Sequence, residues 1–313
     1  MTTLFSRLSG FVLMLSIGIN VFAQDYVFEA KNTFNVIKYA NCVTELNNAY
    51  AEPLNDYRNL LMTCDRNIYL LMQNINRSPT SYDCKRLSPY QDEVYACKSK
   101  MDSIQPFREK NEIDRMVSRA ENACLNVSTC CDRINTYFSQ SQYKNDPDFA
   151  QYKILKEKMH SAVSQASAMW FEATQEATRV ADAAEINLLQ YSDKADFVVP
   201  MKTDISMFKD LMNSFGAGVI DYTKIRQKIQ SLSGSINYNK NLSGKDLSKL
   251  SSSNYQMVYN DFYRHCADGV SYITDLTQKM EKNAEVDEIR SIFSKARSAY
   301  SSAVDTYNSF INQ

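Results

Sequence analysis

The stretch "NACLNVSTCCDRINTY" (122–137) places three cysteines, Cys124, Cys130 and Cys131, within eight positions. It lies in a longer run of mostly apolar residues that are spaced alternately by four and three: Ile113, Val117, Ala120, Cys124, Val127, Cys131, Ile134 and Phe138. Residues at this spacing share one face of an α-helix, so the run predicts a long helix with its cysteines on or beside a buried seam.

The same periodicity recurs along the chain in seams that begin at Leu54, Val163 and Val286, whereas no comparable run alternates every second residue as a strand would. Seven glycines and six prolines in 313 residues are too few for a turn-rich β-sandwich or barrel. We therefore predict an all-α fold: an elongated antiparallel helical bundle with coiled-coil-like heptad seams, disulfide-stapled in the N-terminal half.

Turn residues divide this pattern into separate helices. Pro53 predicts a tight turn between the first two helices, and Pro106 should kink or split the third. Asp146 should cap the long helix that follows Pro147. The expected helices are 28–50, 53–76, 89–138, 147–195, 201–214, 220–232, 254–281 and 284–311.

The opening residues resemble a signal peptide. Nine apolar or small residues (11–19) are followed by Val21 and Ala23, which favour cleavage after Ala23. An uncleaved membrane anchor is the alternative, but nine residues are about half of the ~20 that a spanning helix needs. A lipoprotein would carry Cys where Gln24 stands. We expect a periplasmic or secreted protein without a membrane span after cleavage.

The predicted organisation has five parts. They are a signal peptide (1–23), a Cys-rich helical region (24–145), a long central helix plus short helices (146–230), a Ser-rich flexible loop (231–254) and a C-terminal helical hairpin (255–313). Without the leader the net charge is −2, which gives no electrostatic reason to expect nucleic acid or an acidic membrane as a partner.

The cysteines favour disulfides, because their number is even and the chain carries an export signal. The candidates are Cys42, Cys64, Cys84, Cys97, Cys124, Cys130, Cys131 and Cys266. A zinc site is the more specific alternative to disulfides. However, no pair of cysteines has C-x-x-C spacing, and the two histidines, His160 and His265, are far apart in the sequence. A nucleophile made by Cys266 beside His265 is disfavoured, because neighbours on a helix point about 100° apart. We assign no catalytic, cofactor-binding or metal-binding residue.

Helix geometry limits the pairings. On a continuous helix Cys124 and Cys131 are ~10.5 Å apart, beyond the ~7 Å between Cα atoms that a disulfide allows. These cysteines should therefore reach other segments. A hairpin about Pro53 would bring Cys42 level with Cys64, which is our preferred pair. A hinge at 77–88 would instead bring Cys64 level with the region of Cys97. Cys266 should then link the two halves of the chain; the alternative is a buried free thiol or a disulfide to Cys266 of a second chain.

Two functional hypotheses follow. The first is an exported, non-enzymatic binding or scaffold protein of a bacterial cell envelope, acting through contact with another envelope or extracellular protein, or with a second copy of the chain through helix seams. The alternative is a helical carrier of a small ligand, or an enzyme with a site between helices. Glu157 and His160 have the Glu-x-x-His spacing of di-iron helices, but the second copy that such a centre needs is missing.

Overall fold

The computed structural model describes residues 24–73, 79–89, 91–216, 220–241 and 254–312, with side chains from Asn32 onward. The predicted signal peptide lies outside the described residues. Within these ranges every regular element is an α-helix or a short 3-10 helix, and no strand occurs, which confirms the all-α class. No helix in the described ranges is long and apolar enough to cross a membrane.

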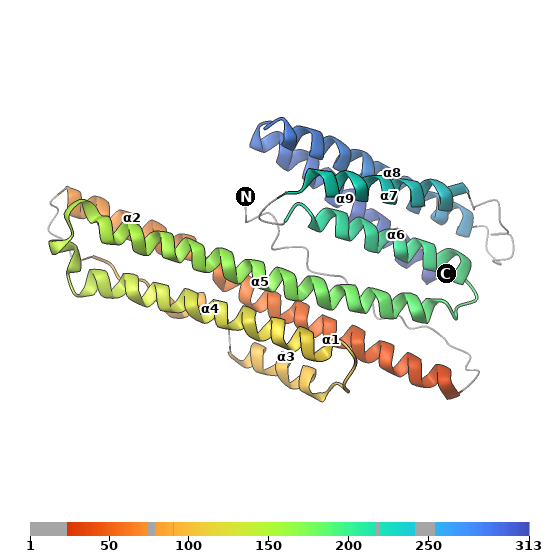
Figure 1. The fold of residues 1–313 in the computed structure, drawn as a ribbon, viewed down its shortest axis with the longest axis horizontal. Coiled ribbons are helices and arrows are strands. Elements are labelled where there is room, and N and C mark those ends of the chain that lie inside the picture. The colour runs from red at the N-terminus through yellow and green to blue at the C-terminus, as the bar shows by residue number, and fades with distance from the viewer. Residues whose placement is uncertain (1–23, 74–78, 90, 217–219, 242–253, 313) are drawn as a thin grey trace. The chain divides into compact units, whose positions relative to one another are not determined.

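Two compact units divide within one long helix, between Ala181 and Asp182 (Figure 1). In chain order the elements are α1 (Gln24–Asn55), α2 (Tyr57–Met72), η2 (Cys84–Leu87), α3 (Gln91–Ser103), α4 (Lys110–Ser139), η3 (Gln142–Asn145), η4 (Pro147–Phe149), α5 (Ala150–Leu189), α6 (Ala195–Asn213), α7 (Tyr222–Asn241), α8 (Asn254–Glu281) and α9 (Val286–Ile311).

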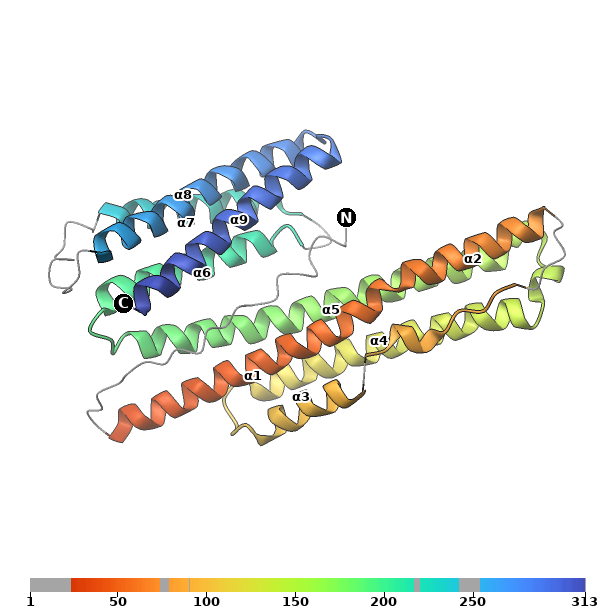
Figure 2. The same ribbon diagram turned by 180° about the vertical axis from the view of Figure 1, so that it is seen from behind.

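The predicted turn at Pro53 is absent. Pro53 lies inside the last turn of α1, and Asp56 between α1 and α2 keeps right-handed helical dihedral angles. α2 therefore continues onward from the end of α1 rather than folding back along it, as Figures 1 and 2 both show. A proline removes one backbone hydrogen bond and bends a helix, but it does not by itself reverse the chain.

Other breakers act as the sequence indicates. Pro106 lies in the segment that separates α3 from α4. The Asp146 carboxylate accepts hydrogen bonds from the backbone N–H groups of Gln151 and Tyr152, at 3.0 and 3.3 Å, and so caps the start of α5. Although burial opposes its charge, these bonds together with one from the Tyr137 hydroxyl lower the pKa of Asp146 below its ordinary value.

The predicted Ser-rich loop is partly helical. α7 runs to Asn241, so residues 231–241 are helix rather than loop, and residues 242–253 lie outside the described residues. The reason is tertiary packing: Leu232, Ile236 and Asn239 are buried at helical spacing, and their burial outweighs the weak helix propensity of the intervening serines and glycine.

The first unit is built around α4 and α5. Every residue of the α4 seam, from Ile113 to Phe138, is buried. α5 meets α1 where Tyr50 stacks on Trp170 with ring centroids 4.9 Å apart. It meets α4 where the Trp170 indole donates to the sulfur of Cys124 at 3.3 Å. The Ala-rich face of α5 thus forms part of the core of this unit, with Ala166 and Ala173 fully buried.

In the second unit, α8 and α9 form a hairpin whose tight turn includes Asn283 in the left-handed region. α6 packs on α8 at Gly269, where the ring of Phe208 fills the space that a side chain would need. An added Cβ would lie 2.0 Å from Phe208 Cζ, and that ring is itself fully buried and set edge-on to Tyr300. Glycine at this position therefore permits the close approach of the two helices.

Two glycine substitutions test this packing. Gly269→Ala should destabilise the protein by about 1–3 kcal/mol, because the Phe208 ring has nowhere to move. Gly234→Ala is the matched control: it also lies in a helix, but nothing is within 4 Å of its added Cβ. It should stabilise by about 0.5–1 kcal/mol through helix propensity alone. Urea denaturation followed by circular dichroism measures both. Equal effects of the two changes would contradict the contact.

Candidate functional site

One disulfide is present among the described residues, between Cys84 of η2 and Cys131 of α4, whose Cα atoms are 5.8 Å apart. Asn135, one turn along α4, donates to the backbone carbonyl of Tyr82 at 2.7 Å and accepts from the Tyr82 N–H at 3.1 Å. The segment before α3 is therefore fixed to α4 both covalently and by hydrogen bonds. Cys131 does reach a different chain segment, as the seam geometry predicts.

The preferred pair Cys42–Cys64 is wrong in this structure, because both are buried free thiols. The cause is the continuous path of α1 into α2: without a reversal at Pro53, 22 residues of helix place the two cysteines ~33 Å apart along the chain. The competing link of Cys64 with the region of Cys97 is not formed either.

Cys266 is also a free thiol, so the predicted link between the two halves is wrong in this structure. Its side chain is fully buried in the core of the second unit. Burial, followed by the charge of Asp204, raises the pKa of the Cys266 thiol. The sulfur therefore faces the interior of its own unit. Cys124 and Cys130 remain thiols too; Cys130 lies 4.0 Å from the backbone carbonyl of Lys158 on α5.

The partial di-iron motif is not assembled into a centre. Glu157 is exposed, and His160 is set edge-on to the ring of Tyr57 with centroids 5.9 Å apart. Within the described ranges, no group of three or more His, Cys, Asp or Glu side chains is placed to hold a metal ion.

Tyrosine hydroxyls join helices to carboxylates in both units. In the first unit, Tyr39 of α1 donates to Asp114 of α4, and Tyr152 of α5 donates to Asp65 of α2 at 2.7 Å. In the second unit, Tyr307 of α9 donates to Glu185 near the end of α5 at 3.3 Å. A buried hydroxyl needs a partner, so each bond favours one alignment of its two helices.

A buried ion cluster holds α6 against the end of α5. The Lys202 ammonium lies 2.9 Å from Asp182 and 2.7 Å from Glu185, and Glu185 also accepts the bond from Tyr307. Although burial opposes its charge, the two carboxylates raise the pKa of Lys202. Lys202 therefore stays protonated, and the cluster is a structural anchor between α5, α6 and α9.

A second polar cluster lies within the second unit around Asp204, which is 0% exposed. Its carboxyl accepts a bond from the Asn239 side chain at 2.8 Å, and the Asn239 carbonyl accepts one from Tyr259 at 3.0 Å. Burial raises the pKa of Asp204, and hydrogen bonds from Ser235 and Asn239 oppose that shift. The cluster thus joins α6, α7 and α8 through polar contacts within an apolar core.

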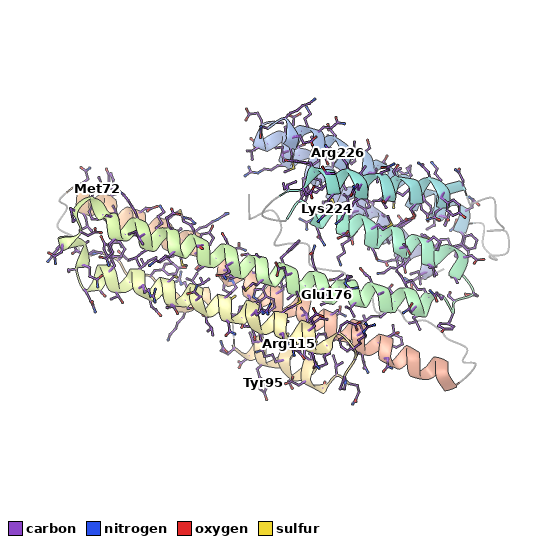
Figure 3. All side chains as sticks on the ribbon, in the orientation of Figure 1. Met72, Tyr95, Arg115, Glu176, Lys224 and Arg226 are labelled. Atoms are coloured by element: carbon purple, nitrogen blue, oxygen red, sulfur yellow. A yellow bond between two sulfur atoms is a disulfide. The ribbon has the colours of Figure 1, made fainter. Side chains whose placement is uncertain are left out.

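A surface groove of about 610 Å³ runs between α7 and α8. The ion pair between Arg226 and Glu281 joins the two helices at one end, and Figure 3 shows Arg226 on α7. Gly234 keeps the floor open, because nothing lies within 4 Å of the position of its missing Cβ. The remaining lining consists of small, amide or hydroxyl side chains with one isoleucine: Ile229, Gln230, Ser233, Asn237, Thr274, Thr277 and Gln278.

The outer face of α2 carries exposed side chains of a different kind. Met62 and Tyr69 are 63% and 60% exposed, one heptad apart, and the exposed residues Arg58 and Arg66 share their face. The buried residues of α2 lie on the opposite side of the helix. In the part of the chain that the structure describes, neither guanidinium forms an ion pair. We call Arg58, Met62, Arg66 and Tyr69 the α2 stripe; Met72 is exposed further along, near the end of α2 (Figure 3).

Sequence reasoning missed Asp204 and the α2 stripe, although both left a signal. Asp204 follows Met201 by three and precedes Phe208 by four, which puts a carboxyl on an apolar seam. Met62 and Tyr69 repeat at seven residues beside, rather than on, the seam of Leu54, Leu61 and Ile68. The choice of carboxylate for each tyrosine left no signal, because it depends on which helices meet.

No protein-family model matches the chain, and neither a curated protein nor a solved structure shows significant similarity to it.

The hydrogen bonds of the buried tyrosine hydroxyls lead us to predict that the protein unfolds at alkaline pH. Burial, followed by the bonded carboxylate, raises the pKa of Tyr39 and Tyr152, and burial raises that of Tyr259 to about 12. Because these values exceed the unfolded value of about 10, the stability they confer is complete below pH ~10 and is lost as pH rises further.

Tyrosinate absorbance and far-UV circular dichroism, recorded over the same pH range, test this prediction. Ionisation of the buried tyrosines should coincide with the loss of helical signal. The urea-unfolded chain is the control, because all its tyrosines titrate near the ordinary value of about 10. Complete ionisation of the native protein while its helical signal persists would contradict the buried hydrogen bonds.

Proposed function

We propose that this chain is an exported, non-enzymatic helical binding or scaffold protein of a bacterial cell envelope, which acts through protein–protein interaction. The proposal includes an elongated antiparallel bundle with coiled-coil-like seams as the scaffold and the α2 stripe as the contact surface. The observation that carries it is the composition of that stripe: aromatic, methionine and arginine side chains are the types enriched at the centres of protein interfaces.

The chemistry of the stripe indicates the chemistry of its partner. Met62 and Tyr69 offer apolar area, while Arg58 and Arg66 offer guanidinium groups that carboxylates bind in bidentate fashion. A helix or extended segment with acidic residues flanking an apolar centre would match both features. The rest of the protein is weakly acidic overall, so long-range attraction of that partner depends on the local charge of α2.

A charge reversal on α2 tests the proposed interface. Arg58→Glu with Arg66→Glu should lower the recovery of specific partners from the native envelope fraction by at least about tenfold, because two charge-assisted contacts become repulsive. The matched control is Arg115→Glu with Arg119→Glu, which makes the same charge change on the exposed face of α4 (Figure 3). Both variants should fold, since exposed substitutions change stability by only about 0.5 kcal/mol.

Quantitative proteomics of the captured proteins at low and high salt measures the difference. The proposal expects a set of proteins that the α4 variant retains and the α2 variant loses, with binding that weakens as salt rises. Equal recovery by both variants would contradict the assignment of the interface to α2. Equal loss would also contradict it, because general electrostatic attraction would then explain the capture.

A second candidate function is carriage of a small ligand in the α7–α8 groove. Its support is the open floor at Gly234 and the array of amide and hydroxyl groups, which can exchange hydrogen bonds with a neutral polar molecule. A small molecule retained by the natively purified protein and displaced by Gly234→Leu would favour this function over the first. Ser231→Leu, exposed on α7 but outside the groove lining, is the control.

A further inference from the structure

Two of the free thiols lie in one small contact between α1 and α3. Cys97 of α3 is buried, and its sulfur lies 3.5 Å from the Glu45 carboxylate of α1. Glu45 follows Cys42 by three residues, so their side chains share one face of α1. The Lys100 ammonium, one turn after Cys97, lies 3.4 Å from the same carboxylate oxygen of Glu45.

The charges of this contact act on both sulfurs. Burial, followed by Glu45, raises the pKa of Cys42, while Lys100 opposes the shift. Burial, a hydrogen bond to Glu45 and its charge, and then the charge of Cys42 raise the pKa of Cys97 to about 11. The pKa values of both thiols therefore depend on the same carboxylate, Glu45, and the same ammonium group, Lys100. The pKa of Cys97 also depends on Cys42.

We propose that Cys42 and Cys97 are a thiol pair that a disulfide-containing oxidant, small molecule or protein, converts into a second disulfide between α1 and α3. In the part of the chain that the structure describes, the other free cysteines have different surroundings. The Cys124 sulfur accepts a bond from Trp170, Cys130 lies at a backbone carbonyl of α5, and Cys266 belongs to the second unit. Burial and then the charge of Asp65 raise the pKa of Cys64 to about 12, and Lys156 of α5 opposes this shift. The groups that act on Cys64 are therefore Asp65 and Lys156 rather than another cysteine.

The oxidation of Cys42 and Cys97 proceeds by two successive thiol–disulfide exchanges. The thiolate of one cysteine attacks a sulfur of the oxidant, forms a mixed disulfide and releases the first oxidant thiolate. The thiolate of the other cysteine then attacks the protein sulfur of that mixed disulfide and releases the second. The two protein thiols lose two protons and two electrons, and the oxidant's disulfide becomes two thiols.

The position of α3 explains how an oxidant reaches buried thiols and what the bond would do. α3 is a 13-residue helix that packs mainly on α1. Because α3 is short, we expect it to open locally at lower cost than the long helices of its unit, and such opening exposes both sulfurs. Because Cys84–Cys131 already ties the segment before α3 to α4, a Cys42–Cys97 bond would fix α3 itself to α1 and close that opening.

Peptide mapping of the full-length protein tests the pair. The reduced protein is reoxidised with oxidised glutathione, alkylated and digested with trypsin without reduction. Cys42 lies in peptide 39–58 and Cys97 in peptide 87–98, and the proposal expects these two peptides linked in wild type. The Cys84–Cys131 link is the internal control for reoxidation. Separately alkylated 39–58 and 87–98, or either one linked to a different cysteine, would overturn the proposal.

Substitutions of the cysteines and of Glu45 provide a second test of the Cys42–Cys97 pair. Cys124→Ser should keep the 39–58/87–98 link, whereas Cys42→Ser should abolish it and leave Cys97 alkylated. Glu45→Gln should speed the reoxidation several-fold, because removal of the shared carboxylate lowers the pKa of both thiols and raises the fraction of reactive thiolate. A slower or unchanged rate for Glu45→Gln would contradict a shared site, since Glu45 acts on both sulfurs only if they lie together.

Discussion

Hydrogen bonds from buried tyrosines to carboxylates on other helices are the constraint on which the alignment of the helices depends. A heptad seam specifies that a helix is buried on one face, but it is nearly indifferent to a slip of seven residues, or ~10.5 Å, along the neighbouring helix. The bonds Tyr39–Asp114, Tyr152–Asp65 and Tyr307–Glu185 remove that freedom, because each hydroxyl meets its carboxylate in only one alignment. Twenty tyrosines beside a single tryptophan suit this role, since the ring fills the seam and the hydroxyl selects the alignment.

The free energies of these hydrogen bonds are large enough to decide between helix alignments that bury similar apolar area. A hydrogen bond to a charged group contributes about 1.5–3 kcal/mol, and a buried partner left alone costs about 1–3 kcal/mol. A slipped helix would lose the bond and leave the hydroxyl buried without a partner, although its apolar contacts could be largely recovered. Apolar burial therefore supplies most of the driving force for folding, and the polar contacts decide between alignments of similar apolar area. The buried Lys202 cluster and the Asp204 cluster act in the same way within the second unit.

Helix positions could be read from the sequence because periodicity is a local signal. The seam from Ile113 to Phe138 predicts α4 closely, and Asp146 predicts the cap of α5. The path at Pro53 could not be read, because a proline at a helix end is compatible with both a bend and a reversal, and tertiary packing decides. Once α2 continues α1, the pairing of Cys42 with Cys64 fails as well. The same limit applies to 231–241, where buried side chains outweigh local propensity, and to the partner of each tyrosine.

The most direct test of this account is a double-mutant cycle on Tyr152 and Asp65, with Tyr152→Phe and Asp65→Asn made singly and together. Trp170, the only tryptophan, is buried in the same unit and reports its unfolding in urea by fluorescence. Asp65 also binds Lys156 at 2.8 Å, and the cycle removes that contribution because it is common to both arms. We expect a coupling energy of about 1 kcal/mol or more between the two substitutions. Substitutions that add to within about 0.3 kcal/mol would contradict it.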